Sequence, residues 1–447
     1  MIIKTLETFL TDFFQTKPIN YENNIFVAYS GGIDSHVLLH ALAQLRQTFP
    51  KLKLTAVHVH HGLFQAANDW VQHCRQVCDE LKVGLQIINV KVKCSAGLSV
   101  EEQARIARYQ ALTKLLQAGD LLITAHHADD QAETCLLQFL RGAGIKGLAS
   151  MPVMISFAQG FLARPFLSIS RQDLLEYAQK NNLSWIEDDS NHNLKFTRNF
   201  LRYTIMPEFK KRWPNINKTI MRVAKNCAEA NELLQELAKQ DIEELKGSVK
   251  NTLAIAKLQK LSLARQKNVL REWLHAQGFR LPSAIKLKHI ISDVINARTD
   301  ADPCIVWQEV EVRRHQDNLY AMSPLFKFNN KVDLSWDGKN PLKLPGNLGI
   351  LRCEKAMGQG LKAEVFSKNI VVRFRQGGEQ CKLPNREGTH KLKKLFQEWG
   401  VPSWQRDRIP LLYINDQLAA IVGYAVCSEL AAFNNEVGMS LLLDRID

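Results

Sequence analysis

The sequence lacks the features that mark membrane, secreted and zinc-binding proteins. It has no run of about 18 uninterrupted apolar residues, which a membrane-spanning helix requires. Its first ten residues, MIIKTLETFL, are soon followed by Asp12, unlike a secretory leader. The nine cysteines include no CxxC pair, which favours reduced, mostly buried thiols over a disulfide framework or structural zinc. These absences predict a soluble cytoplasmic protein without a membrane partner.

What is present is an enzyme-sized, basic chain. The 447 residues carry 58 Lys and Arg against 45 Asp and Glu, a net charge of +13. Ordinary values of 46% hydrophobic and 23% charged residues exclude disordered and collagen-like classes. Most of the positive surplus lies beyond residue 210, so we expect a polyanionic partner that contacts the later part of the chain.

The first part of the chain has the pattern of a doubly wound, parallel α/β sheet. Short β-branched runs at 25–28, 54–59, 85–90 and 121–125 alternate with helical patterns. Apolar residues at helical spacing predict helices that cover the sheet. These residues are Leu38, Leu42, Leu45 and Phe49, and then Trp70, Cys74, Val77 and Leu81.

Composition changes predict three domains. Residues 1–210 form the α/β catalytic domain, and 211–328 an α-helical middle domain, since 216–300 has long Leu/Ala/Glu/Lys periodicity with few breakers. Residues 329–447 form a small α+β domain, because short strands such as 370–375 and 409–414 alternate with Gly, Pro and Asn.

A glycine-rich turn, SGGIDS (30–35), lies between the first predicted strand and the first covering helix. Ligands of open α/β sheets bind at the carboxyl ends of strands, and glycines let the backbone approach a phosphate. The alternative is a tight turn capped by Asp34 or Ser35. The turn lacks the Gly-Lys-Ser/Thr of a Walker A loop, so it predicts a different nucleotide chemistry from γ-phosphoryl transfer.

A second polar motif, THHADDQAET (124–133), follows the fourth predicted strand and should reach the same sheet edge. Asp130 and Glu133 are three residues apart on the ensuing helix, so both project from one face toward Mg²⁺ or an ammonium group. Helix capping is the alternative for Asp129. Neither HExxH nor clustered cysteine is present, so hard carboxylates favour magnesium over zinc.

These motifs resemble those of a known superfamily. SGGIDS is similar to the SGGxDS loop of the N-type ATP pyrophosphatases, or PP-loop enzymes, which cleave ATP between its α and β phosphates. HHADDQAET resembles the HHxxDQxET hallmark of the tRNA(Ile)-lysidine synthetases within it. That family adenylates C2 of the wobble cytidine, position 34, of CAU-anticodon tRNA(Ile), and free L-lysine then displaces AMP. The resemblance implies a carbon–nitrogen ligase that uses ATP and Mg²⁺.

The resemblance also implies site residues. The expected ATP-binding residues are Ser30, Gly31, Gly32, Ile33, Asp34, Ser35 and His60. For His60, which ends the second strand, a buried or turn histidine is the alternative. The expected catalytic residues are Asp34, Asp130 and Glu133, with Asp34 and Asp130 as Mg²⁺ ligands and Asp130 with Glu133 handling metal or lysine.

Three motifs imply tRNA contacts in the first domain. RGAGIKG (141–147) has the form GxGxxG but follows a helix, so it resembles the family's RGxGxxGL loop rather than a dinucleotide fingerprint. A helix opened by a capping box of Ser99 and Glu102 resembles E-x-x-AR-x-x-RY, although a solvated face is its alternative. EDDSNHNLKFTRNFLRYTIMP (187–207) resembles DxSN...RNxxRxxxxP. The expected tRNA-binding residues are Arg105, Arg108, Arg141, Gly142, Arg198 and Arg202.

Basic segments downstream extend this expectation. Residues 210–225 carry six basic residues and no acid, which favours binding to RNA phosphates. The last domain resembles the C-terminal substrate-binding domain of the long lysidine synthetases. There the expected tRNA-binding residues are Arg373, Arg375, Lys391, Lys393 and Lys394.

Two alternatives remain at this point. A PP-loop tRNA thiolase needs reactive or cluster-binding cysteines, whereas the only close pair here, Cys74 and Cys78, lies on a predicted amphipathic helix. A non-catalytic tRNA-binding protein is disfavoured by the intact SGGIDS loop and acidic helix. A homodimer is compatible with either class.

Overall fold

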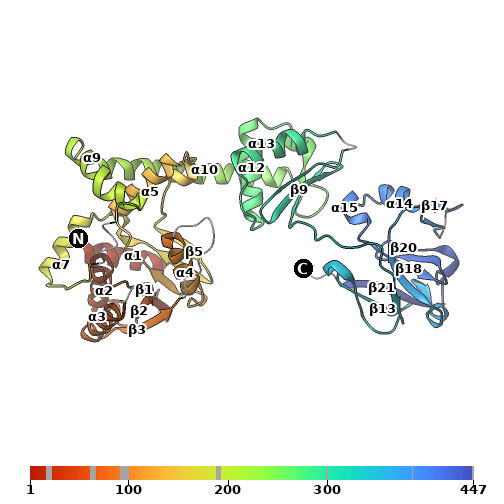
Figure 1. Ribbon diagram of the computed structural model, residues 1–447, viewed down its shortest axis with the longest axis horizontal. Helices are drawn as coiled ribbons and strands as arrows, with labels where there is room; N and C mark the ends of the chain where they lie inside the picture. Colours follow the sequence, from red (N-terminus) through yellow and green to blue (C-terminus); the bar gives the residue numbers. More distant parts are fainter. Residues whose placement is uncertain are drawn as a thin grey trace. The chain divides into compact units, whose positions relative to one another are not determined.

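The computed structural model describes residues 1–16, 23–60, 67–90, 100–187, 193–298, 301–384 and 386–444. The chain forms two compact units, Met1–Leu234 and Gln235–Asp447, whose elements are labelled in Figure 1. Among the described residues, no helix has the length and apolar character needed to cross a bilayer.

The first unit is built on a six-stranded sheet with strand order β3-β2-β1-β4-β6-β5. The strands are β1 (Asn24–Ala28), β2 (Lys53–His60), β3 (Gly84–Asn89), β4 (Leu121–Ile123), β5 (Met154–Phe157) and β6 (Gly160–Ala163). All neighbours are parallel except the β5–β6 hairpin. The predicted doubly wound sheet is confirmed, and the four predicted strands correspond to β1–β4.

The helices of the first unit cover both faces of this sheet. They are α1 (Ile2–Thr16), α2 (Ile33–Gln44), α3 (Ala67–Glu80), α4 (Val100–Thr113), α5 (Ala128–Leu140), α6 (Ile145–Leu148), α7 (Arg171–Lys180), α8 (Thr197–Phe200), a π-helix (Leu201–Ile205), α9 (Met206–Arg212) and α10 (Ile216–Glu244). Along β1, Ile25 and Val27 pack with α1, α2, α3 and α7, whereas Phe26 packs with α4 on the opposite face. This alternation follows from the two-residue period of a strand.

The helical prediction holds for most of the periodic residues. Leu38, Leu42 and Cys74 are fully buried under the sheet. Trp70 is different, because it is only partly buried and lines a cavity instead of the core. Periodicity does not separate these outcomes, since a residue near a helix end can reach beyond the sheet face.

The middle part of the chain is mostly helical up to Ile295 and also contains a sheet. Its helices are α10, α11 (Ile255–Leu258), α12 (Leu263–Ala276), α13 (Ala284–His289) and a π-helix (Ile290–Ile295). Its antiparallel strands are β7 (Leu253–Ala254), β8 (Cys304–Trp307), β9 (Val310–His315) and β10 (Asn318–Met322), in the order β7-β10-β9-β8. The helices of the predicted middle domain, 211–328, are present, but the prediction did not include this sheet, in which Val310 and Val312 lie on a strand.

The last part of the chain is the expected α+β structure. Its larger sheet joins β11 (Leu334–Trp336), β15 (Ile370–Phe374), β18 (Pro410–Ile414), β19 (Gln417–Ile421) and β20 (Ala425–Val426). A second sheet joins β12 (Leu342–Lys343), β13 (Ile350–Met357), β21 (Val437–Asp444) and β14 (Leu361–Lys362). A ribbon of β16 (Gln380–Cys381) and β17 (His390–Lys391) leads into α14 (Leu392–Glu398), which α15 (Ser403–Arg406) follows.

Two further features bear on the sequence expectations. Cys381 and Cys427 form a disulfide with Cα atoms 5.7 Å apart, so the expectation of reduced thiols is wrong for this pair. The two residues are 46 positions apart, and no local sequence pattern indicates their approach. The second unit contains separate hydrophobic cores around Leu270, Val372 and Leu395. The proposed three-domain division remains a prediction.

Candidate active site

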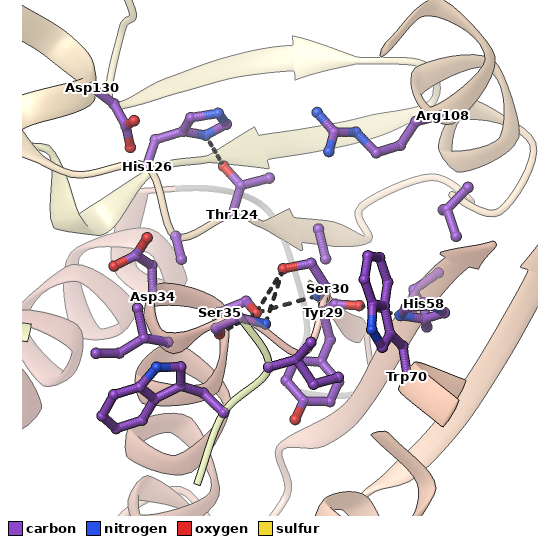
Figure 2. Close-up of a pocket in the computed structure, with 18 of the residues that line it drawn as sticks. Tyr29, Ser30, Asp34, Ser35, His58, Trp70, Arg108, Thr124, His126 and Asp130 are labelled. Atoms are coloured by element: carbon purple, nitrogen blue, oxygen red, sulfur yellow. Dashed lines mark hydrogen bonds between the residues drawn. The ribbon is translucent and has the colours of Figure 1, made fainter. Parts of the chain in front are cut away.

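The site lies where the sheet order reverses. β1 pairs with β2 on one side and with β4 on the other, so the carboxyl ends of β1 and β4 are adjacent. The turn 30–35 follows β1, and the histidines and acids of the second motif follow β4. Parallel sheets bind ligands at such a point. The structure thus brings both sequence motifs to one cavity of about 680 Å³, shown in Figure 2.

The glycine-rich turn is held by its own serines. Ser35 Oγ lies 3.1 Å from Ser30 Oγ, accepts from Ser30 N at 3.2 Å and donates to the Gly32 carbonyl at 2.9 Å. Gly31 has φ +86°, a conformation that favours glycine. Gly32 begins α2 without a side-chain cap, so the first N–H groups of the helix remain available for an anion.

Several residues complete the cavity wall. Asp34 and Arg108 point into it from α2 and α4, as Figure 2 shows. His60 also lines it, and its buried Nε2 has no hydrogen-bond partner among the described residues. Trp70 contributes an aromatic face from α3. The sequence motifs did not single out Trp70, because an apolar residue at helical spacing indicates core packing.

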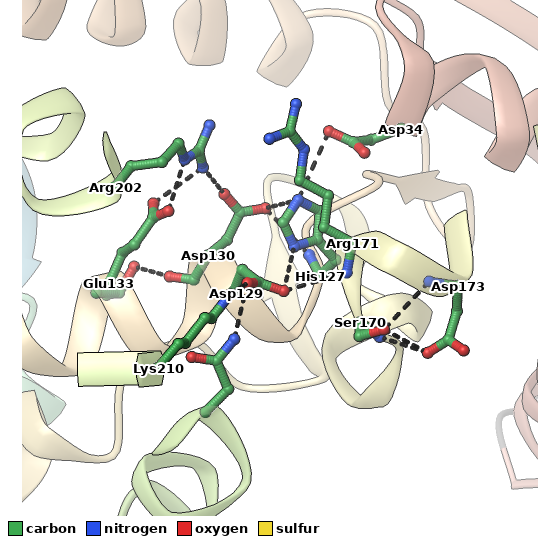
Figure 3. Close-up of polar contacts among 12 residues, drawn as sticks. Asp34, His127, Asp129, Asp130, Glu133, Ser170, Arg171, Asp173, Arg202 and Lys210 are labelled. Carbon is green, nitrogen blue, oxygen red and sulfur yellow. Dashed lines mark hydrogen bonds and ion pairs between the residues drawn. The ribbon is translucent and has the colours of Figure 1, made fainter. Parts of the chain in front are cut away.

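Four charged side chains form one compact cluster beside the cavity. Arg198 contacts Asp130 at 3.0 Å and Glu133 at 2.9 Å, and Arg202 contacts them at 2.7 and 2.6 Å. Glu133 is 2% exposed, so the arginines rather than water compensate its charge. The acids expected to handle metal or lysine and the arginines expected to hold RNA are therefore partners of each other. Figure 3 shows this for Arg202 with Asp130 and Glu133.

His127 joins this cluster to the glycine-rich turn. Its Nε2 lies 3.4 Å from Asp130 Oδ2 and 3.6 Å from Asp34 Oδ2, and its Nδ1 lies 3.9 Å from Asp129 Oδ2. Burial lowers the pKa of His127, but the hydrogen bond to Asp34 and the surrounding carboxylates raise it above the ordinary value overall. The His127 ring thus links the loop to α5.

Asp130 and His126 both have a lowered pKa, for different reasons. Burial raises the pKa of Asp130, but the charges of His127, Arg198 and Arg202 outweigh it and hold that pKa far below the usual range. Burial lowers the pKa of His126 to about 3, so this imidazole is neutral at physiological pH. A permanently ionised Asp130 is suited to electrostatic organisation rather than proton transfer.

Asp34 has a carboxylate oxygen that is available to bind a cation. Its Oδ1 is buried and has no hydrogen-bond partner among the described residues. Asp130 has both oxygens engaged, by the His127 N–H and by the arginines. Within the described ranges, no cluster of three His, Cys, Asp or Glu side chains is arranged for a metal. The free oxygen of Asp34 would fit Mg²⁺, which prefers carboxylate oxygens, whereas the expected ligand Asp130 does not fit because both of its oxygens are engaged.

The other expected RNA residues of the first unit occupy varied settings. Arg105 and Arg108 lie 5.6 and 5.7 Å from the ring centre of Tyr109, and only Arg108 lines the cavity. Arg141 and Gly142 are exposed at the end of α5, and Gly142 has φ +68° with open space around it. The capping-box residue Ser99 and the DxSN motif at 189–191 lie outside the described residues.

The expected residues of the second unit divide into paired and exposed groups. Arg373 binds Asp333 and Asp416, and Arg375 binds Asp407, so these two charges are neutralised locally. Lys391, Lys393 and Lys394 are exposed on β17 and α14. The lysines are the better placed candidates for phosphate contacts.

A second cavity of about 840 Å³ was not foreseen from the sequence. Asp129 lines it and accepts hydrogen bonds from Lys210 Nζ and Asn217 Nδ2, both at 2.7 Å (Figure 3). Lys210 is one of the six basic residues of 210–225, and Asp129 compensates its charge. Lys211 and Lys225 also face acids, Glu208 and Glu229.

Comparison with known families places this geometry in a class. A family model described as a PP-loop domain matches residues 3–209, and models described as the TilS substrate binding domain and the TilS substrate C-terminal domain match 253–320 and 370–443. The first unit is therefore a PP-loop domain, the ATP-using class that the SGGIDS loop indicated.

The relatives narrow the class further. The tRNA(Ile)-lysidine synthase of Coxiella burnetii is 46% identical over 94% of this chain and 93% of its own length. That of Methylococcus capsulatus is 41% identical over 89% and 90%. The chain belongs to the tRNA(Ile)-lysidine synthase family. Among solved structures, the U34-tRNA thiolase NcsA from Methanococcus maripaludis aligns with a TM-score of 0.41 and 16% identity, over 50% of this chain and 79% of that one.

Proposed function

We propose that the chain catalyses ATP-dependent formation of lysidine at cytidine 34 of CAU-anticodon tRNA(Ile). The observation that carries the proposal is the convergence of the SGGIDS turn, Asp34 and the acid–arginine cluster on one cavity, in a chain of this family. The products are the modified tRNA, AMP and pyrophosphate.

The first step is adenylation of the tRNA. The cytosine O2 forms a bond to the α-phosphorus of ATP, and the bond from that phosphorus to the β-phosphate oxygen breaks. The free N–H groups at the start of α2 and the turn receive the triphosphate and stabilise the leaving pyrophosphate. When bound beside Asp34, Mg²⁺ supplies further charge neutralisation. In this proposal the nucleoside of ATP lies against His60 and Trp70, which line the cavity.

The second step is attack by lysine. The lysine ε-amine, in its neutral form, forms a bond to C2 and gives a proton to the solvent, while the C2–O bond breaks and AMP leaves with the bonding electron pair. We assign lysine to the second cavity, because it shares lining residues with the first one: Arg171, Trp185 and Glu187 line both. Asp130 and Glu133, held by Arg198 and Arg202, contribute charge and position rather than direct metal binding.

The remaining chain supplies tRNA contacts in this proposal. Exposed Arg141 with Gly142 receives the anticodon loop, while Lys391, Lys393 and Lys394 receive a distant part of the tRNA. The division into domains 1–210, 211–328 and 329–447, a homodimer and a cytoplasmic location stay predictions.

The thiolase alternative is not favoured by the cysteine pair that lies closest in the sequence. Cys74 and Cys78 are buried, and burial raises the pKa of each thiol to about 12. Thiolates are therefore not populated at neutral pH, although sulfur transfer requires them.

The direct test uses purified protein, ATP, labelled lysine and an unmodified CAU-anticodon tRNA transcript. Lysidine in the nucleoside digest, with one pyrophosphate per lysine incorporated, is expected. With all substrates present, pyrophosphate release that no lysine incorporation accompanies, or incorporation without ATP, would contradict the proposal.

A further inference from the structure

The two cavities share a wall. Six residues line both of them: Ile33, Arg171, Trp185, Glu187, Arg202 and Tyr203. A molecule in the second cavity can therefore direct one end across this wall toward the glycine-rich turn. The charges on the wall determine which end of the molecule remains in the second cavity.

Most charges around the second cavity are already compensated. Arg202 is held by Asp130 and Glu133. Asp129 is held by Lys210, and Asp173 accepts hydrogen bonds from the Ser170 N–H and hydroxyl at the start of α7. These groups form the frame of the site, so they are not available to a ligand without breaking an existing contact.

Two charges on the shared wall remain open. Within the described part of the chain, the guanidinium of Arg171 and the carboxylate of Glu187 form no ion pair, and both residues are exposed. The backbone of Arg171 is fixed, because its N–H donates to Asp129 Oδ2 at 3.1 Å. Glu187 is oriented by the Trp185 indole N–H at 3.4 Å. Among the described residues, the wall therefore presents one cation and one anion that no ion pair compensates.

A free α-amino acid carries the complementary pair, a carboxylate and an ammonium, at one end. We infer that Arg171 and Glu187 are specificity-determining residues that bind the α-carboxylate and α-ammonium of lysine, while its ε-amine enters the first cavity. The lysine side chain spans about 6 Å when extended, from five bonds of about 1.5 Å at tetrahedral angles, so it can cross a shared wall. This inference rests on the proposed function.

The test compares three amines that share the reacting amine but differ in the other end. Cadaverine lacks the α-carboxylate, and 6-aminohexanoate lacks the α-ammonium. We expect kcat/KM for lysine to exceed that for either analogue by about 10- to 100-fold, the range of a charge-assisted hydrogen bond. Arg171→Gln should lower kcat/KM for lysine by that factor and leave cadaverine unchanged. Glu187→Gln should lower lysine and leave 6-aminohexanoate unchanged.

Matched variants separate recognition from general charge loss. Lys180 is exposed at the end of α7 and lines neither cavity, so Lys180→Gln should alter none of the three amines. Arg171→Lys should restore part of the preference for lysine over cadaverine, since it restores the charge without the bidentate geometry.

The first half-reaction distinguishes the possible failures. Pyrophosphate release with ATP and tRNA but no amine should be the same in wild type and Arg171→Gln. A slower release in the variant would assign Arg171 to the triphosphate and overturn the inference. An equal loss with all three amines would overturn it as well. If wild type itself releases no pyrophosphate with tRNA, the proposed function fails instead.

Discussion

Glu133 receives the Arg202 guanidinium side-on, with Nε 2.6 Å from Oε1 and Nη2 2.9 Å from Oε2. Both bonds point at a carboxylate that is 2% exposed, and Arg198 adds a third at 2.9 Å. Removing one partner of a buried ion pair leaves the other charge without compensation. The relationship therefore makes Glu133 as much a structural residue as a catalytic candidate.

Glu133→Gln should lower the free energy of unfolding by about 2 to 3 kcal/mol, because two guanidinium groups lose a charged acceptor. It should also slow lysidine formation more than it weakens tRNA binding. Urea titration, filter binding and single-turnover assays measure the three quantities. Glu208→Gln is the matched control, since its pair with Lys211 is 64% exposed on the acid side. The control should stay within about 0.5 kcal/mol of wild type, and equal losses in both variants would contradict the assignment.

The two glycines of the turn should respond differently to substitution. An added Cβ at Gly32 meets nothing closer than Ser30 Oγ at 3.6 Å, so Gly32→Val should fold normally and lose ATP-dependent pyrophosphate release. At Gly31, φ +86° strains any side chain, and Gly31→Ala should lose about 1 to 2 kcal/mol of stability. Circular dichroism and pyrophosphate release separate the two. A folded and active Gly32→Val protein would show that phosphates do not approach this backbone.

The stability of the chain should fall as the pH is lowered from 7 to 5. Burial lowers the pKa of His36, His58 and His126, so the unfolded chain binds protons that the folded chain does not. His126 alone, with a pKa of about 3, contributes a loss of about 1 to 2 kcal/mol over this interval. His127 acts oppositely, because its raised pKa gives stability that is present at low pH and lost as the pH rises through the folded value.

Urea unfolding midpoints at pH 7 and pH 5 check this direction. His58→Asn should flatten the dependence, since it removes one of the three buried imidazoles. A midpoint that rises toward pH 5 would mean that His127 outweighs the other three.

Neutralising Lys391, Lys393 and Lys394 together should weaken binding of full-length tRNA and reduce its salt dependence by up to about three phosphate contacts. ATP binding should be unchanged. Arg373→Gln should leave the salt dependence nearly unaltered, because Asp333 and Asp416 already neutralise that arginine. A minimal anticodon stem-loop should bind the triple variant and wild type equally. Equal weakening on both RNAs would place the lysines at the active site.

The sheet and the glycine-rich turn could be predicted from the sequence, because the patterns that indicate them are local. Four short β-branched runs predict β1–β4, and SGGIDS predicts its own place between a strand and a helix. The sequence did not predict strands β8–β10, because their alternation of apolar and polar residues is short and includes the buried polar residues Glu311 and Arg314.

The partnerships within the site were not accessible, because they join distant segments. Arg198 and Arg202 lie 65 to 72 positions from the acids that they bind. Spacing on each helix predicted that the residues of a pair share a face, but it carries no information on what that face meets. The sequence thus placed both motifs at one sheet edge, whereas the pairing of acid with arginine required the tertiary fold, and the roles of these residues stay predictions.

The common wall of the two cavities has a thermodynamic consequence. Arg171, Trp185 and Glu187 face both chambers, so a ligand that reorders any of these side chains changes the free energy of binding on the other side. Linkage makes this effect reciprocal: if bound nucleotide alters the dissociation constant of the amino acid by some factor, the amino acid alters that of the nucleotide by the same factor. The order in which the two substrates arrive then affects occupancy along the way but not the stability of the ternary complex.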